Sequence, residues 1–130
     1  MAKKTLFWIA LISLLATLGF FSLAESETPM TEKQALDRLI SQIQKDKLYD
    51  SWTTLSCLSI FIEDKTEKYF DITIREKHDG KCPGDPLTAP IVDRFRVNRL
   101  TGRIEWYDWD LELHPYKAVI EWKRENQKKQ

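Results

Sequence analysis

The stretch 94-RFRVNRLTGRIEWY-107 decides the fold of this chain of 130 residues. Apolar and polar side chains alternate on both sides of Leu100-Thr101-Gly102, which predicts two strands joined by a turn. Gly102 can take a positive φ in that turn without steric cost. The stretch is therefore predicted to be a β-hairpin, whose apolar positions share one face: Phe95, Val97, Ile104 and Trp106.

Another hairpin is predicted earlier in the chain. Its apolar positions alternate in the same way: Leu58, Ile60 and Ile62 on one strand, Phe70, Ile72 and Ile74 on the next. The charged cluster at 63–68 turns the chain between these strands. Residues 76–90 include two Gly and three Pro, which is the composition of a loop. The two hairpins together predict four antiparallel strands with one continuous apolar face.

A helix over residues 31–46 is predicted to cover that face. Thr31 can cap it and Gln34 can close a capping box, and apolar residues then recur at helical spacing: Ala35, Leu36, Leu39, Ile40 and Ile43. The predicted fold is α+β, with this N-terminal helix packed on the four-stranded sheet. Pro115 suits the start of a short second helix, and residues 123–130 are predicted to fray.

The N-terminus has the pattern of an export signal. Two lysines precede an apolar run from Leu6 to Phe21, and Ser22-Leu23-Ala24 puts small residues where a signal peptidase reads. A signal peptide at 1–24 is therefore expected, followed by a single domain at 25–130. The alternative is an uncleaved membrane anchor, because Thr5 to Leu23 carries no charge and is near the length that a tilted spanning helix needs.

Export and charge narrow the class of partner. Without Lys3 and Lys4, 18 basic side chains face 20 acidic ones, a formal charge of about −2. Nucleic-acid binders need a clear basic excess, so nucleic acid is not an expected partner. The expected location is the periplasm or the outside of the cell, and the expected partner is another exported or envelope protein. The membrane becomes a partner only if the signal stays uncleaved.

The cysteines, Cys57 and Cys82, are predicted to form a structural disulfide in that oxidising compartment. A metal or redox thiol is the alternative. The chain has no Cys-x-x-Cys, and His78 with Cys82 is two ligands short of a zinc site. No metal and no cofactor are expected.

The hairpin at 95–104 resembles the last hairpin of the PepSY domain, which has an apolar strand, an Asp or Asn, a Thr-Gly turn and a second apolar strand. Asn98 and Thr101-Gly102 stand at these positions. The order of a helix followed by a small antiparallel sheet is similar too, whereas the section from Cys57 to Cys82 does not match. The resemblance implies a non-catalytic exported module that binds or inhibits partners such as peptidases, and it assigns no functional residue.

A catalytic or metal site has weak support in the sequence. His78 and His114 are the only imidazole bases, and each stands beside a loop marker, so both are interpreted as loop residues. Alternating acids follow Trp106, at Asp108, Asp110 and Glu112, but the glycine of a calcium loop is missing. Their alternation with apolar residues is typical of an edge strand. A small hydrolase remains as an alternative, since a site can assemble from distant residues.

Two surfaces are candidates for protein binding. The first is the outward face of the sheet, with Arg75, Arg94, Arg96, Arg103 and Tyr107, since arginine and tyrosine supply much of the energy of protein interfaces. The second is the loop at 83–90, where Asp85 stands between prolines and the cysteine stiffens the chain.

The sequence thus predicts a small exported, non-catalytic binding or inhibitory module of the bacterial periplasm. The alternative is an immunity or lysozyme-inhibitor-like protein that plugs an enzyme with the 83–90 loop. Three tryptophans stand near the ends of elements, Trp52, Trp109 and Trp122, and an exposed cluster of them would favour a partner site.

Overall fold

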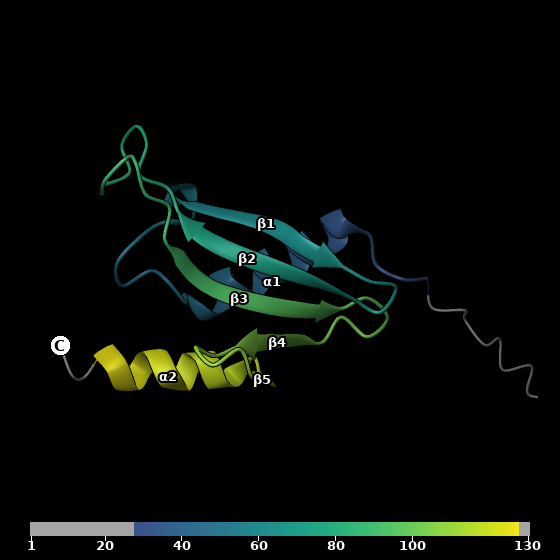
Figure 1. Ribbon diagram of the computed structural model, residues 1–130. Helices are drawn as coiled ribbons and strands as arrows, with labels where there is room; N and C mark the ends of the chain where they lie inside the picture. Colours follow the sequence, from purple (N-terminus) through teal and green to yellow (C-terminus); the bar gives the residue numbers. More distant parts are fainter. Residues whose placement is uncertain (1–27, 128–130) are drawn as a thin grey trace, which may run out of the picture.

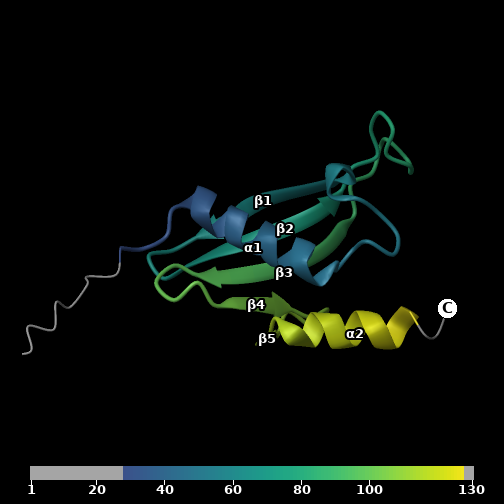
Figure 2. The same ribbon diagram turned by 180° about the vertical axis from the view of Figure 1, so that it is seen from behind.

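The computed structural model describes residues 28–127, in which five strands form one antiparallel sheet in the order β1-β2-β3-β4-β5. Helix α1 lies across one face of the sheet, and α2 lies beside β4 and β5 at its edge (Figures 1 and 2). The elements are α1 (Glu32–Asp46), the 3-10 turn η1 (Leu55–Cys57), β1 (Leu58–Lys65), β2 (Tyr69–Glu76), β3 (Ile91–Asn98), β4 (Ile104–Tyr107), β5 (Leu113–Pro115) and α2 (Lys117–Gln127). The α+β prediction is confirmed, but the number of four strands is wrong because β5 adds a fifth.

Helix α1 begins as its sequence predicts. The Thr31 hydroxyl accepts a hydrogen bond from the Gln34 amide at 3.2 Å, and the Gln34 side chain accepts one from the Thr31 amide at 2.9 Å. This capping box satisfies two amides that the first turn leaves without partners. The helix ends before Lys47, which adopts the left-handed conformation with φ 50°.

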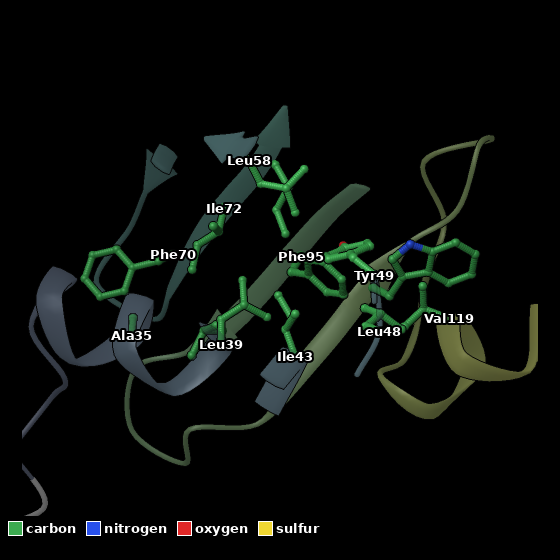
Figure 3. Close-up of a cluster of buried hydrophobic side chains, with 13 residues drawn as sticks. Ala35, Leu39, Ile43, Leu48, Tyr49, Leu58, Phe70, Ile72, Phe95 and Val119 are labelled. Atoms are coloured by element: carbon green, nitrogen blue, oxygen red, sulfur yellow. The ribbon is translucent and has the colours of Figure 1, made fainter. Parts of the chain in front are cut away.

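The core lies between α1 and the sheet (Figure 3). Ala35, Leu39 and Ile43 line the buried side of α1. The sheet residues packed against them are those predicted from the alternation, and the most buried are Leu58, Phe70, Ile72, Ile74, Phe95, Val97 and Trp106. Val119 of α2 is also fully buried, so the C-terminal helix is part of the same core.

The hairpin of β3 and β4 confirms the turn prediction. Asn98 Oδ1 accepts the amides of Leu100 and Thr101 at 2.9 and 3.0 Å, and Phe95 pairs with Trp106 across the strands. Gly102 has φ 70°, and a Cβ there would stand 2.7 Å from Nε of Arg38, which donates to the Gly102 carbonyl. The positive φ therefore favours glycine, and a larger residue would also displace the Arg38 side chain.

The predicted edge strand after Trp106 is wrong in part. The carboxylate of Asp108 accepts the amides of Asp110 and Glu112, both at 2.9 Å, and Leu111 has φ 62°. Residues 108–112 therefore form a turn, and the strand resumes only at β5. A side chain that caps backbone amides competes with the ladder, and this overrides the alternating pattern.

The predicted fraying of residues 123–127 is also wrong, since α2 continues to Gln127. Its last turns are held by contacts with distant segments: Lys123 pairs with Asp93, and Gln127 donates to the Ser51 hydroxyl at 2.8 Å. No helix in the described part of the chain is long and apolar enough to cross a membrane. The predicted signal peptide and the predicted start at Glu25 lie outside the described residues.

Candidate functional site

The loop between β2 and β3 projects beyond the end of the sheet (Figures 1 and 2). A disulfide joins Cys82 in its first half to Cys57, the last residue of η1 directly before β1, with 5.4 Å between the Cα atoms, as predicted. The Lys77 amide donates to the Cys57 carbonyl at 2.8 Å beside this bridge. The base of the loop is therefore fixed to the sheet by both a covalent bond and a hydrogen bond.

Asp85 shapes the second half of this loop. Its carboxylate accepts the Leu87 amide at 2.9 Å, and its carbonyl accepts the Thr88 amide at 3.0 Å. The turn that results holds Leu87 outward, with 92% of the residue's surface exposed. Asp85 was predicted to bind a partner, but its side chain already has a structural role, because it stabilises the turn of the loop.

His78 lies inside the loop and joins its two halves. Its Nδ1 is 2.8 Å from the Asp85 carbonyl and 3.1 Å from the Thr88 hydroxyl, and its Nε2 contacts the Glu76 carboxylate. A carbonyl and a carboxylate only accept, so the imidazolium, with a proton on each nitrogen, satisfies both contacts. The hydrogen bond to Glu76, and next the one to the Asp85 carbonyl, raise the pKa of His78 above its usual value.

The imidazole of His78 also explains Gly84. The Gly84 backbone has φ 124°, and a Cβ at this position would stand 2.5 Å from the His78 ring. Any side chain there would collide with the ring and strain the backbone as well. The conformation of the loop therefore requires glycine at position 84.

We expect the loop to loosen as the pH rises. Because the pKa of His78 is raised in the folded loop, the stabilisation is fully present below its unfolded value of about 6.5 and is lost as the pH rises through the folded value. Amide hydrogen-exchange protection of Leu87 and Thr88 should therefore decrease between pH 6 and pH 9. The variant His78→Gln should show weaker protection with no such pH dependence; a pH-independent wild-type loop would contradict the imidazolium assignment.

Thr88, His78 and Glu76 follow one another in the order of a hydroxyl, an imidazole and a carboxylate. The Thr88 hydroxyl, however, donates to the Asp85 carbonyl at 3.0 Å, and the same carbonyl is the acceptor for His78 Nδ1. The nitrogen that faces Thr88 thus carries a proton and cannot serve as its base in this arrangement. The three side chains work as loop contacts.

The predicted arginines lie together on the open face of the sheet, opposite α1, but other groups of the protein already bind them there. Arg96 donates to both carboxylate oxygens of Asp71, at 2.8 and 3.0 Å, and its guanidinium stacks 3.5 Å from the ring centroid of Tyr69. The Tyr107 hydroxyl also contacts Asp71, at 3.2 Å. Burial, and next the charge of Asp71, raise the pKa of Tyr107 to about 12. Arg96 therefore already has the bidentate carboxylate that an interface would offer it.

The other arginines of this face are also engaged. Arg94 Nε lies 3.5 Å from Glu63, and Arg75 donates to the Ala89 carbonyl at 2.9 Å. Arg103 is the most exposed, with 64% of its side chain accessible and Glu105 4.0 Å away. The predicted sharing of one face agrees with the register, in which Arg94 is opposite Tyr107 and Arg96 opposite Glu105.

A buried carboxylate, Asp93, was not recognised from the sequence as a structural centre. It accepts hydrogen bonds from the Tyr49 hydroxyl at 2.7 Å and the Trp106 indole at 2.9 Å, and it pairs with the Lys123 ammonium at 2.9 Å. Burial, and next the charge of Asp93, raise the pKa of Tyr49. The only signal in the sequence was that Asp93 is in phase with Phe95 and Val97, which places it on the buried face.

Asp108, Glu112 and His114 bring their ligand atoms within 4.8 Å of one another. His114 Nε2 is 2.7 Å from Asp108 Oδ2, and Asp108 also holds the turn described above. The amide of Glu112, and next His114, lower the pKa of Asp108. The three side chains are therefore close together because they close the turn. Asp110, which belongs to the predicted series of acids, is not part of this cluster.

No family model, curated protein or solved structure matches this chain. The similarity to the PepSY domain therefore stays a prediction that rests on the turn at Asn98 and Thr101-Gly102.

Proposed function

We propose that this protein is a small exported, non-catalytic binding module that inserts the tip of its 83–90 loop into a concave site on another exported or envelope protein. The observation that carries the proposal is Leu87, an apolar side chain 92% exposed on a projecting loop. An exposed leucine on a braced loop can fill an apolar pocket of a partner without a large loss of chain entropy.

Three features of the loop support this role. The disulfide fixes its base, His78 joins its halves, and Asp85 holds the turn before Leu87. Each contact lowers the number of conformations that the free loop can adopt, so less entropy is lost on binding. The disulfide also suggests a compartment outside the cytoplasm, in agreement with the predicted signal peptide.

The paired charges of the open sheet face make that surface the weaker candidate. To bind a partner through Arg96, the protein would have to exchange Asp71 for another carboxylate, and the net gain of such an exchange is small. Arg103 is exposed, but it stands at the end of the sheet face, next to Glu105. The loop needs no such exchange, because Leu87 has no contact to give up on its exposed side.

We expect Leu87→Asp to weaken partner binding by about a hundredfold, as for an apolar side chain at the centre of an interface, and to leave the melting temperature unchanged. The partner is first isolated from a periplasmic extract with the exported protein, and affinity is then measured by calorimetry. Leu100→Asp, at a half-exposed leucine in the β3–β4 turn, is the matched control and should bind normally.

A double variant tests the sheet face in the same assay. Arg94→Ala with Arg103→Ala removes two charges from that face and should leave the affinity within about twofold. If this variant loses binding and Leu87→Asp keeps it, the sheet face is the site and the loop proposal is wrong. If the partner is converted to a product, the module is an enzyme and the non-catalytic proposal is wrong.

A further inference from the structure

A groove of about 380 Å³ lies between the β4–β5 turn and α2, away from the projecting loop. The indoles of Trp109 and Trp122 line it side by side in tilted contact, with ring centroids 6.0 Å apart and 56° between the planes, and Trp106 also lines the groove. Trp109 is 70% exposed, although tryptophan usually covers a core. The volume is within the range of sites that bind small groups.

Acidic side chains surround this aromatic groove. Asp110 comes from the turn, and Glu121 and Glu125 come from α2, where they are four residues apart and line the groove together with Trp122. Among residues 28–127, none of these three carboxylates takes part in an ion pair. The nearby Lys123 ammonium, 5.6 Å from the Trp122 ring centroid, is already paired with Asp93.

The groove therefore fits a cation that has a flat, apolar surface. Aromatic faces attract cations through their quadrupole, and carboxylates add hydrogen bonds of defined direction. A guanidinium uses both, because it is planar, stacks on aromatic rings and donates to a carboxylate in a bidentate manner, whereas an ammonium is a compact and strongly hydrated charge. A neutral planar group can donate hydrogen bonds to the three carboxylates, but it leaves their negative charge without a counter-charge.

The open face of the sheet already holds an arginine side chain through contacts of this kind. There, the guanidinium of Arg96 lies 3.5 Å from the Tyr69 ring centroid and 5.4 Å from that of Tyr107, and the Asp71 carboxylate accepts two of its hydrogen bonds. In this internal arrangement, two aromatic side chains and a carboxylate contact one arginine side chain. The groove repeats these components with Trp109, Trp122 and the acids of α2.

We propose that the groove of Trp109 and Trp122 binds an arginine side chain of a partner polypeptide. This proposal does not depend on the loop, because the groove lies on another part of the surface. The groove would bind a positively charged side chain, whereas Leu87 would enter an apolar pocket. A partner that uses both surfaces would present an arginine to the groove and a pocket to the loop.

The test is a titration of the exported protein with the peptide acetyl-Gly-Arg-Gly-amide, followed by the indole N–H signals in NMR spectra. The signals of Trp109 and Trp122 should shift in a saturable manner, and the Trp52 signal should stay in place. Peptides with citrulline or lysine instead of arginine are the matched ligands. Citrulline, which is planar but neutral, and lysine, which is charged but not planar, should each bind at least fivefold more weakly than arginine.

Variants locate the binding. Trp109→Ala, at an exposed side chain, should weaken the arginine peptide at least fivefold, and Glu121→Gln with Glu125→Gln should do the same and lessen its salt dependence. Trp52→Phe, at an exposed tryptophan elsewhere, should bind like the wild type. The proposal is overturned by equal binding of the citrulline or lysine peptide, by unchanged affinity of Trp109→Ala, or by the absence of a saturable shift. Because no partner protein is used, these outcomes are independent of the loop experiment.

Discussion

Replacing Asp93 with alanine is expected to lower the free energy of unfolding by about 3–5 kcal/mol, as for a buried ion pair that loses one partner. The substitution leaves the Lys123 ammonium without its counter-charge, although only 15% of that side chain is exposed. It also leaves the Tyr49 hydroxyl and the Trp106 indole without an acceptor. Each such buried donor adds a further penalty of its own.

Urea unfolding followed by circular dichroism measures this loss. The matched control is Lys123→Met, which removes the charge but keeps most of the apolar stem, and Asp93→Ala with Lys123→Met should be more stable than Asp93→Ala alone. A loss below about 1 kcal/mol for Asp93→Ala would show that the carboxylate is solvated and is not the centre of the cluster.

The sequence predicts local features well where the deciding interactions lie within a few residues. The capping box at Thr31 and Gln34 involves neighbours in the chain, as does the turn at Asn98 and Gly102. Alternation in 94–107 also assigned Phe95 and Trp106 correctly to the buried face. In each case the pattern and the local chemistry agree, so nothing distant has to be known.

The misjudged segments depend on contacts between distant residues. The end of α2 is composed of charged and amide side chains, but Lys123 pairs with Asp93, 30 positions earlier, and Gln127 reaches Ser51. The acids after Tyr107 alternate as in a strand, but the hydrogen bonds of Asp108 bend the chain before the ladder can continue. Periodicity does not detect either effect, because both arise from specific hydrogen-bond partners.

The candidate binding surfaces, too, were predicted where local alternation decides and missed where distant contacts decide. Alternation correctly put Arg94, Arg96 and Tyr107 on one face. The engagement of Arg96 depends on its position opposite Asp71, a pairing of β3 with β2 across a long loop that alternation alone does not predict. The exposure of Leu87 and the proximity of the two indoles in the groove likewise depend on how the chain is folded in space, so the sequence pattern did not predict them.

Removal of the disulfide is expected to have the second largest effect. Cys57→Ser with Cys82→Ser opens a loop whose ends are 25 residues apart, and the chain-entropy model assigns such a closure about 3 kcal/mol. For a domain of this size, the melting temperature should fall by about 10–20 °C. Reduction of the wild-type protein with dithiothreitol should lower it by a similar amount.

The double variant also separates the stability of the fold from the order of the loop. Below its melting temperature the sheet should remain intact, because its core does not include either cysteine. The base of the loop, however, loses its covalent tie, so the protection of the Leu87 amide from hydrogen exchange should decrease, and partner affinity should decrease with it. His78→Gln leaves the bridge in place and should reduce affinity less. Full affinity of the double variant at a temperature where it is folded would show that the disulfide serves stability alone and that the loop does not need to be ordered before it binds.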